Sequence, residues 1–506
     1  MAGLEEAVQL TTSPSASGTG ALRERIHGWV DPGVAFIELF GSEQHAFWLD
    51  AGADASEGTT RMGAAAAGPS VLFATAHPAG RPESLTRFDP RTGRVRAEQG
   101  SLFDVLRRER VAAPTEVAGW VGWFGYEFGA AACGAPIAER GPQEPPDAAW
   151  MRFDRFVEFD HAARSITVCV APGSEAAAAD AAGTDAESRG WVAAVVTTLG
   201  RLIRTQPGVR EHAARPQPAG TFEQRKVNWR HSEEQYLDLI RQVQRHISAG
   251  DAYQLCLTNA ATIEARLDPL DTYLRLRAAS PTANGGYVRF GGWALASASP
   301  EQFLTVSTDG LISTRPIKGT RPRGALPADD ERLRAELAGD EKERAENLMI
   351  VDLMRNDLGR VARLGTVAVT GLLEVESYRQ VHQLVSTVTA RLDDGADALD
   401  AVAACFPAGS MTGAPKLAAM SILHRLEGGP RGPYAGSFGL IADDGSLRLS
   451  MIIRSILIGP DIVSLGAGGG ITAMSAPRSE VAEVALKARA LLAAVNRAAE
   501  RRPSIL

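Results

Sequence analysis

The chain has 506 residues, of which 45% are hydrophobic and 22% charged, and its formal net charge is −7. This length exceeds the usual limit of a single core, so two domains or one large elaborated domain are expected in an ordinary globular protein. The negative charge argues against a nucleic-acid surface, and no apolar run is long enough to span a membrane. Four scattered cysteines without zinc-type spacing indicate reduced thiols, and hence a cytoplasmic protein.

The first region of the chain is predicted at residues 21–210, and up to about residue 170 it is expected to consist mainly of strands. The residues before it, 1–20, lack the features of a secretion signal and are expected to be disordered. The apolar runs 34–40 and 46–49 suggest a pair of strands. At 119–127 the sequence GWVGWFGYE alternates glycine with aromatic residues, which is typical of a strand packed closely against another backbone.

A polar stretch separates this N-terminal region from the rest of the chain. Residues 171–190 are poor in large apolar side chains and indicate a surface loop, followed by one helix from about Trp191 to Thr205. The next polar segment, 206–224, marks the predicted boundary to a second domain at residues 225–502.

The second domain is predicted to alternate helices and strands. Ser232, followed by acidic residues, fits a helix N-cap, and this helix is expected to end at Gly250. Residues 252–261, which include Gln254, are predicted to form a strand. The final helix is expected from roughly Ser479 to Arg501.

A short basic segment, STRPIKGTRPRG at 313–324, carries a lysine in an unusual setting. Lys318 stands between a β-prone run and Gly319, while Pro316 and Pro322 stiffen the backbone on either side. Burial lowers the pKa of an ammonium group and frees the amine to act as a nucleophile. The neighbouring arginines fit a solvated basic loop equally well, so this segment alone leaves both interpretations open.

Two acidic pairs suggest a metal site. Glu343 and Glu346, like Glu480 and Glu483, are spaced i, i+3, so each pair lies on one helix face. If the pairs point inward, their carboxylates offer hard oxygen ligands to one Mg²⁺ ion. If they point outward, they belong to solvated helix faces.

Other patterns suggest a binding site for an anion. The small-residue segment FPAGSMTGAPK, at 406–416, precedes a predicted helix, and backbone N–H groups at a helix start suit an anionic ligand. Arg454 is a charge in an apolar strand and needs a partner. Tyr434 offers an orienting hydroxyl, and the run GAGGG at 466–470 offers bare backbone to a ligand.

Taken together and in order, these segments resemble the chorismate-utilising enzymes. The resemblance is strong from about Glu233 to Leu492, and it is carried by AYQLCL, SPEQF, RPIKGTRPRG, DEKERAENLMIVDLMRNDLGRV, VHQLVSTV, FPAGSMTGAPK, RGPYAGSFG and GAGGGI. It is weaker in the N-terminal region, where FWLDAG and GWVGWFGYE carry it. Within the family the chain is most similar to component I of the aminodeoxychorismate synthases, near relatives of anthranilate synthase component I. The implied fold is α/β (α+β-like), with two packed antiparallel-rich sheets and helices on the outside.

The resemblance also implies a reaction. Lys318 attacks C2 of chorismate as the 4-hydroxyl leaves, and ammonia then adds at C4 and expels the lysine. The product, 4-amino-4-deoxychorismate, leads to 4-aminobenzoate and folate or to a specialised compound. Glu301, in SPEQF, matches the acid proposed for the family, and its pKa is expected to be raised if the site is dry.

The same resemblance assigns roles to the remaining candidates. Glu346 and Glu483 are expected to be the inner ligands of Mg²⁺, with Glu343 and Glu480 acting through water or as outer ligands. The implied substrate-binding residues are Gln254, Thr412, Tyr434, Arg454, Gly468, Gly469 and Gly470.

Three positions favour amination with retention of the pyruvyl group. Gln254 stands where isochorismate-forming relatives carry a lysine that activates water, and Lys318 stands where anthranilate synthases typically carry alanine. Gln383 replaces the histidine of the HLVS motif in pyruvate-eliminating relatives. His382 lies one place earlier, and a shift by one residue on a strand points it to the opposite face.

The expected partners are chorismate and a source of ammonia. No cysteine has the Gly-x-Cys-x-Gly context of a glutamine amidotransferase, so a separate amidotransferase subunit, component II, is expected to deliver ammonia. Two alternatives remain open: anthranilate synthase component I, and a non-catalytic chorismate-binding subunit.

Overall fold

The computed structural model describes residues 21–78, 81–110, 116–138, 140–141, 144–172, 181–206 and 225–500. The expected disorder of residues 1–20 and nearly all of the predicted boundary at 206–224 lie outside the described residues. All four cysteines are free thiols. Among the described helices, none combines the length and the apolar character needed to cross a membrane.

The first of two large sheets joins both ends of the chain. In the described part of the chain it has twelve strands, and neighbours along it pair antiparallel. Its order is β1 (Leu22–His27), β10 (Ser165–Val170), β9 (Arg155–Asp160), β3 (Thr59–Ala64), β2 (His45–Asp50), β13 (Gly285–Phe290), β14 (Trp293–Ser297), β23 (Ser455–Ile458), β24 (Ile462–Ile471), β12 (Gln254–Glu264) and β11 (Asn228–Trp229), with β20 (Gly413–Ala414) paired to β12.

The second sheet is built in the same way. It also has twelve strands among the described residues, again antiparallel. Its order is β17 (Ile317–Pro322), β19 (Val381–Arg391), β16 (Leu311–Thr314), β15 (Gln302–Val306), β22 (Leu447–Met451), β21 (Ser437–Ala442), β7 (Gly119–Phe124), β8 (Ala148–Phe153), β4 (Val71–Thr75), β5 (Ser84–Phe88) and β6 (Val95–Glu98), with β18 (Ala368–Ser377) paired to β19.

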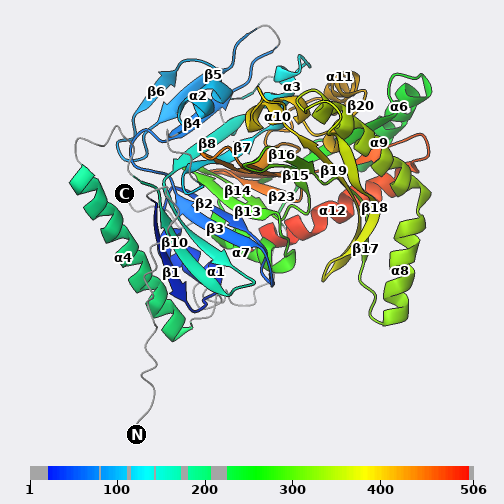
Figure 1. Cartoon of the computed structure of the whole chain (residues 1–506). Coiled ribbons are helices and arrows are strands. Elements are labelled where there is room, and N and C mark those ends of the chain that lie inside the picture. Colours follow the sequence, from blue (N-terminus) through cyan, green and yellow to red (C-terminus); the bar gives the residue numbers. More distant parts are fainter. Residues whose placement is uncertain are drawn as a thin grey trace.

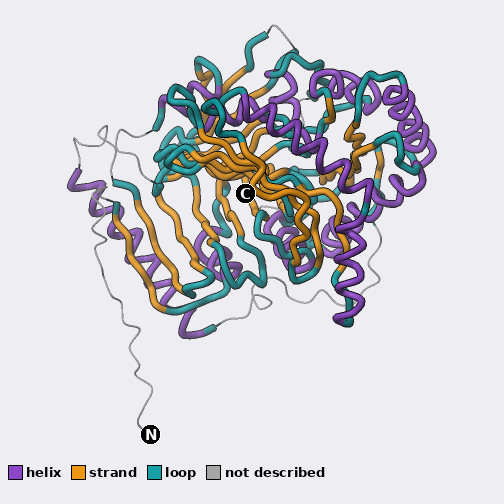
Figure 2. Tube along the Cα trace, turned by 45° about the vertical axis from the view of Figure 1, so that its right-hand side comes forward, coloured by secondary structure: helices purple, strands orange, loops and turns teal. Residues whose placement is uncertain are grey.

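Helices cover the outside of the two sheets, as Figures 1 and 2 show. Helix α12 packs on β24, and α9 packs on β19. The described helices are α1 (Pro32–Phe40), α2 (Leu102–Arg108), α3 (Tyr126–Ala132), α4 (Ala181–Thr205), α6 (Glu233–Ser248), α7 (Pro269–Ala279), α8 (Pro327–Gly339), α9 (Glu341–Gly359), α10 (Ala398–Cys405), α11 (Lys416–Glu427) and α12 (Pro477–Arg497).

The sheets pack face to face through an apolar cluster. The rings of Trp123, from one sheet, and Phe290, from the other, meet edge to face with their centroids 4.8 Å apart. A Cβ atom on Gly286 would lie 2.8 Å from the ring of Phe438, so this close approach requires the glycine. The predicted arrangement of two packed antiparallel-rich sheets with outer helices is confirmed.

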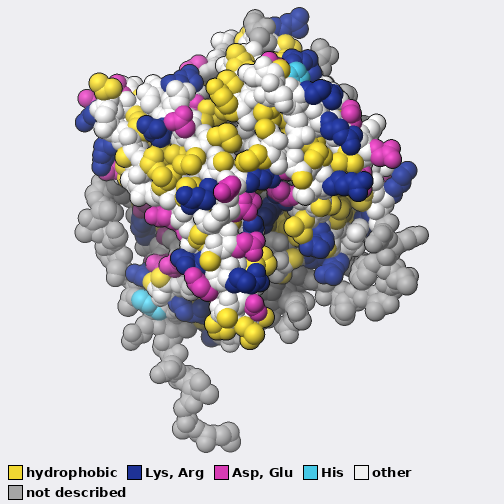
Figure 3. Space-filling view, turned by 90° about the vertical axis from the view of Figure 1, so that its right-hand side faces the viewer, with side chains coloured by type: hydrophobic (Ala, Val, Ile, Leu, Met, Phe, Trp, Pro, Cys, Tyr) yellow, Lys and Arg dark blue, Asp and Glu magenta, His cyan; other side chains and the backbone are white. Residues whose placement is uncertain are grey.

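Both regions of the sequence contribute to both sheets. Strand β2 pairs with β13, and β7 pairs with β21, so hydrogen bonds join the N-terminal strands to the C-terminal ones. The predicted glycine-spaced strand is β7, where a Cβ atom on Gly122 would lie 1.9 Å from the carbonyl oxygen of Ala149. On the face at the right of Figure 1, Lys and Arg side chains are interspersed with Asp, Glu and apolar ones (Figure 3).

Two expectations about local structure are wrong. Residues 34–40 form a helix and not a strand, because Asp31 caps it by accepting from the backbone N–H of Gly33 and Pro32 occupies its first turn. Helix α4 begins at Ala181, about ten residues before the expected start, in keeping with the high helix propensity of alanine. The helix predicted after Ser232 is confirmed, with a reciprocal capping box between Ser232 and Gln235.

Candidate active site

A cavity of about 560 Å³ brings together most of the residues predicted to carry the chemistry. Strands β17 and β24 and helices α9 and α12 contribute to it, in the right half of Figure 1. The predicted residues that line it are Glu301, Lys318, Glu343, Glu346, Tyr434, Arg454, Gly468, Gly469, Gly470 and Glu483. Gln254, Thr412 and Glu480 are buried and do not line it.

Lys318 enters the cavity from an irregular strand. The pairing of β17 with β19 shifts register between Lys318 and Thr320, and Gly319 between them has a left-handed φ of 78°. The Lys318 side chain is 12% exposed, and its Nζ atom lies 3.8 Å from Oε2 of Glu346. The strand therefore presents the lysine to a partly desolvated acidic cluster and not to a basic surface loop.

The charge state of Lys318 differs from the one expected. Burial lowers the pKa of its ammonium group, but the nearby charges of Glu346, Cys256 and Glu301 raise it more, so the pKa lies above its ordinary value. The expectation of an uncharged amine counted burial alone. In the chain by itself, the carboxylates that surround the lysine hold its proton.

Glu301 meets the expectation for a proton donor. Its side chain is buried, and burial raises its pKa to about 7, against the opposing effects of Lys318 and the Ser410 hydroxyl. A carboxyl group that keeps its proton near neutral pH can donate it to a leaving group in the same cavity.

The glycine strand β24 leaves room for the acidic groups. A Cβ atom on Gly469 would lie 3.2 Å from Oε2 of Glu480. On Gly470 it would lie 2.9 Å from Oε2 of Glu346 and 2.1 Å from Nε2 of Gln254. The bare backbone thus lets two carboxylates and one amide lie directly on the strand.

Two lysines that the sequence reasoning missed lie among these glutamates. Lys342 Nζ is 2.7 Å from Oε1 of Glu480 and 3.6 Å from Oε1 of Glu346. Lys487 Nζ is 2.6 Å from Oε1 of Glu483 and donates to the carbonyl oxygen of Gly468 at 2.8 Å. Their positions four residues from Glu346 and Glu483 were a usable signal, because i, i+4 places them on the same helix faces.

The acidic groups suit a hard cation, although they do not form a ready-made cage. In the part of the chain that the structure describes, no three carboxylate, imidazole or thiol groups converge tightly enough to hold a metal ion as their side chains stand. Oε2 of Glu480 is nevertheless buried without a hydrogen-bond partner, on the bare surface of Gly469. Carboxylate oxygens in such a setting are the ligands that Mg²⁺ prefers.

Arg454 is the feature that best indicates an anionic ligand. Its backbone has a left-handed φ of 50°, and its side chain lines the cavity. Burial lowers the pKa of its guanidinium group, against a weaker attraction from Glu483. Among the described residues, no hydrogen bond or close ion pair reaches this half-buried guanidinium group. A cation in such a setting suits a carboxylate supplied by a ligand.

With this geometry established, comparison with known proteins identifies the family. Residues 44–493 match the family of chorismate binding enzymes. The chain belongs to this family.

Other family members resemble the chain over most of its length. It is 40% identical to the aminodeoxychorismate synthase of Streptomyces griseus over 91% of this chain, but it spans only 62% of that protein's length. It is 35% identical to the anthranilate synthase component 1 of Streptomyces coelicolor, covering 98% of this chain and 94% of that one.

Two solved structures share the fold. The anthranilate synthase component I of Streptococcus pneumoniae aligns with a TM-score of 0.65 at 25% identity, covering 84% of this chain and 92% of that one. The menaquinone-specific isochorismate synthase of Escherichia coli aligns with a TM-score of 0.63 at 17% identity, covering 94% and 95%.

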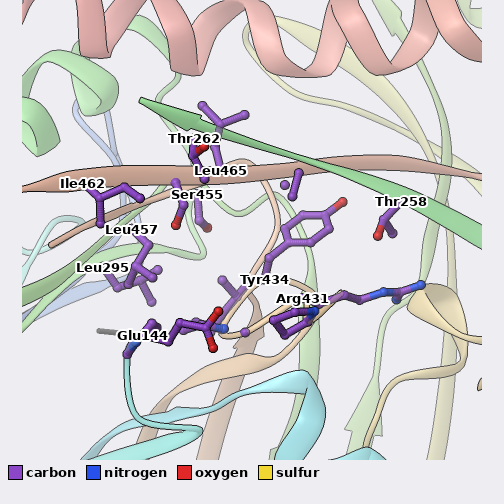
Figure 4. A pocket seen from close by; sticks show the side chains of 18 of the residues that line it. Glu144, Thr258, Thr262, Leu295, Arg431, Tyr434, Ser455, Leu457, Ile462 and Leu465 are labelled. Carbon is purple, nitrogen blue, oxygen red and sulfur yellow. The ribbon is translucent and has the colours of Figure 1, made fainter. Parts of the chain in front are cut away.

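In this chorismate-binding family member, Tyr434 forms a wall between two cavities. A Cβ atom on Gly466 would lie 2.2 Å from the Tyr434 ring, so the ring packs flat on β24 only because residue 466 is glycine. Both residues also line a second cavity of about 170 Å³. Figure 4 shows the ring in the middle of this second cavity, with its hydroxyl on the side of Thr258 and away from Leu457.

Two predicted site residues, Thr412 and Gln254, do not line the large cavity, whereas Gln383 and His382 lie as expected. The hydroxyl of Thr412 donates to the carbonyl oxygen of Ala408 at 3.1 Å and so fixes its own turn. Oε1 of Gln254 is buried without a partner. Gln383 lines the large cavity, whereas His382 faces away from it and contacts Ser377 at 2.8 Å, as the shift by one residue predicted.

Proposed function

We propose that the chain aminates chorismate at C4 with ammonia and releases 4-amino-4-deoxychorismate. The observation that carries the proposal is Lys318, which shares one cavity with the proton donor Glu301 and the unpaired Arg454. The similarity to aminodeoxychorismate synthases over about nine tenths of this chain supports it.

The residues divide the reaction into two displacements. The Lys318 amine bonds to C2 of the ring, the double bonds shift, and the C4–O bond breaks, with Glu301 supplying the proton that lets the oxygen leave as water. The surplus proton on the new C2–N bond returns to Glu301. Ammonia then bonds to C4, the double bonds shift back, and the C2–N bond breaks as a proton passes from the C4 ammonium group to the departing lysine nitrogen. The enzyme is thereby regenerated.

The other residues hold the substrate. Arg454 binds the enolpyruvyl carboxylate, and the Tyr434 hydroxyl orients the same group. The backbone of β24 at Gly468–Gly470 lies against the ring. Gln383, which cannot act as a general base, leaves the pyruvyl group in place.

Glu346 and Glu483 would hold Mg²⁺ directly, supported by Glu343 and Glu480. When bound, the ion would neutralise these glutamates and the ring carboxylate of chorismate. The field that raises the pKa of Lys318 comes largely from such carboxylates, Glu346 first among them. A bound cation would therefore favour the neutral amine that the first displacement requires.

Ammonia is proposed to come from a separate glutamine amidotransferase subunit, with both proteins in the cytoplasm and the product directed to 4-aminobenzoate and folate or to a specialised compound. Anthranilate synthesis is the second candidate, because the chain matches an anthranilate synthase component 1 over nearly the whole length of both proteins. Lys318 and Gln383 favour amination at C4.

The test is incubation of the purified chain with chorismate, Mg²⁺ and an ammonium salt, followed by an aminodeoxychorismate lyase. We expect 4-aminobenzoate from the wild type and from Lys226→Ala, a substitution at an exposed lysine far from the cavity in sequence. We expect none above background from Lys318→Ala. Fluorescent anthranilate would favour the second candidate, and an absence of any turnover would favour a non-catalytic chorismate-binding subunit.

A further inference from the structure

Lys342 occupies an unusual position between the two acidic pairs. It lies at the start of α9, and its ammonium group reaches across to Glu480 on α12 while remaining 3.6 Å from Oε1 of Glu346. Glu480 is 2% exposed and Glu346 5% exposed, so Lys342 contacts two carboxylates that are almost completely removed from water, of which it shares Glu346 with Lys318. It does so where the oxygens face the bare backbone of β24.

We propose that Lys342 is an internal counter-cation, which compensates Glu346 and Glu480 while the chain holds no Mg²⁺ and leaves when the metal ion binds to the acidic cluster. This inference rests on the metal site of the proposed function. It explains why the glutamates stand close together without forming an open cage: their oxygens are arranged around an ammonium group.

The charges of the cavity favour exchange over simple addition. Lys342 already places a positive charge beside Glu346 and Glu480, at 3.6 and 2.7 Å. A divalent cation held by the same acidic cluster would stand close to this ammonium group in a poorly hydrated site, where like charges repel strongly. Departure of the ammonium group removes that repulsion.

Lys342 is also able to leave, since it is about as exposed as Lys487 (34%) and more exposed than Lys318. Its side chain is 32% exposed, and its long aliphatic stem allows the ammonium group to swing into water. Lys318 is 12% exposed on a strand. Lys487 is held by the Gly468 carbonyl in addition to Glu483. When Lys342 leaves, Oε1 of Glu480 is freed, and Oε2 of the same residue already has no partner.

A purely structural role makes the opposite prediction. If Lys342 only ties α9 to α12, its removal loosens the two helices that carry the glutamates and weakens Mg²⁺ binding. If it competes with the metal ion, its removal strengthens Mg²⁺ binding and makes the folded state depend on Mg²⁺.

The experiment is calorimetric titration of MgCl₂ into the full chain without substrate, for the wild type and three variants. We expect Lys342→Met to bind Mg²⁺ about tenfold more tightly, because a positive charge a few ångströms from the ion is removed. Lys342→Arg, which retains the charge, is expected to bind less tightly than Lys342→Met. Arg344→Met removes an exposed charge from the same helix and is expected to stay within about twofold of the wild type.

Thermal denaturation supplies a second readout that does not depend on activity. We expect Lys342→Met to melt below the wild type without Mg²⁺ and to recover with saturating Mg²⁺. Equal or weaker Mg²⁺ binding by Lys342→Met would overturn the inference while leaving the metal site intact. If neither wild type nor variant binds Mg²⁺, even with chorismate present, both the inference and the metal part of the proposed function fail.

Discussion

Arg431 is buried and Arg454 half-buried, but the described residues supply hydrogen-bond partners for the guanidinium group of only the first. Arg431 donates to both carboxylate oxygens of Glu427 at 2.8 and 2.6 Å, and to the carbonyl oxygens of Met411 and Cys256 at 2.6 and 2.8 Å. Burial lowers the pKa of both guanidinium groups, but Glu427 raises that of Arg431 by more, whereas the attraction of Glu483 does not offset burial at Arg454.

The difference distinguishes an arginine that holds the fold together from one that is available to a ligand. Arg431 joins the turn at Met411 to strand β12 at Cys256, and it stacks 4.3 Å from the ring centroid of Tyr126. The Nε, Nη1 and Nη2 atoms of Arg431 each donate to one or more of these protein groups. Arg454 lies in the large cavity with its guanidinium group unused by described residues. A half-buried charge that the described residues leave without a hydrogen-bond partner is poised for a ligand.

Lys318, like Arg454, is a cation that lines the large cavity, and the carboxylates around it belong to the proposed reaction. Its replacement is therefore expected to have the largest effect on activity. Lys318→Ala should lower the rate of amination by about 10⁴-fold or more, since the covalent route is lost. The measurement is kcat with ammonium as the nitrogen source. A rate within tenfold of the wild type would show that no bond to the lysine is needed.

Arg431→Met should have the largest effect on stability. It leaves the carboxylate of Glu427 buried without its partner, and such losses cost about 3–5 kcal/mol in the free energy of unfolding. Denaturation by urea measures the change, and Arg201→Met, which removes an exposed arginine on α4, is the control. If the free energy of unfolding falls by less than about 1 kcal/mol, Arg431 contributes no more than a surface ion pair. The structural role that distinguishes it from Arg454 would then be wrong.

Arg454→Met should show the reverse pattern. The free energy of unfolding should stay the same or rise, because a half-buried charge without a hydrogen-bond partner is removed. KM for chorismate should rise about 10- to 100-fold, since a hydrogen bond to a charged group contributes about 1.5–3 kcal/mol. A destabilised variant with an unchanged KM would assign Arg454 to the architecture instead.

Glu301 gives the smallest effect, a dependence on pH. Its raised pKa, about 7, means that the proton-donating form is present below pH 7 and is lost as the pH rises above it. The ratio of kcat/KM between the wild type and Glu301→Gln should therefore be constant below pH 7. Above that pH it should fall by about tenfold per pH unit. Taking the ratio cancels the titration of other groups. A ratio independent of pH would exclude Glu301 as the acid.

Sequence motifs identified the candidate residues better than they predicted the pKa values and ion pairs of those residues. Lys318, Glu301 and the acidic pairs stand in distinctive motifs, and most of these side chains meet in one cavity. The pKa of Lys318 could not be predicted from its segment, because the charges that raise it come from other elements, Glu346 first among them. The compensating role of Lys342 depends on Glu480, which is remote in sequence.

Local signals misled where two structures suit the same pattern. Residues 34–40 are apolar except for Glu38, so their pattern did not distinguish a buried helix from a strand, and the structure shows a helix capped by Asp31. Thr412 was expected to face the ligand, but the direction of one side chain in a tight turn depends on local hydrogen bonds such as that to Ala408. By contrast, strict alternation along β19 correctly placed His382 and Gln383 on opposite faces.

Intact-protein and peptide mass spectrometry offers the most direct test of the central claim. The chain is incubated with chorismate and Mg²⁺ in the absence of ammonium, so that the first displacement can occur but the second cannot. We expect a covalent adduct with the mass of chorismate less one water, confined to the peptide containing Lys318 and released on addition of ammonium. An active enzyme that forms no adduct, or an adduct on another lysine, would contradict it.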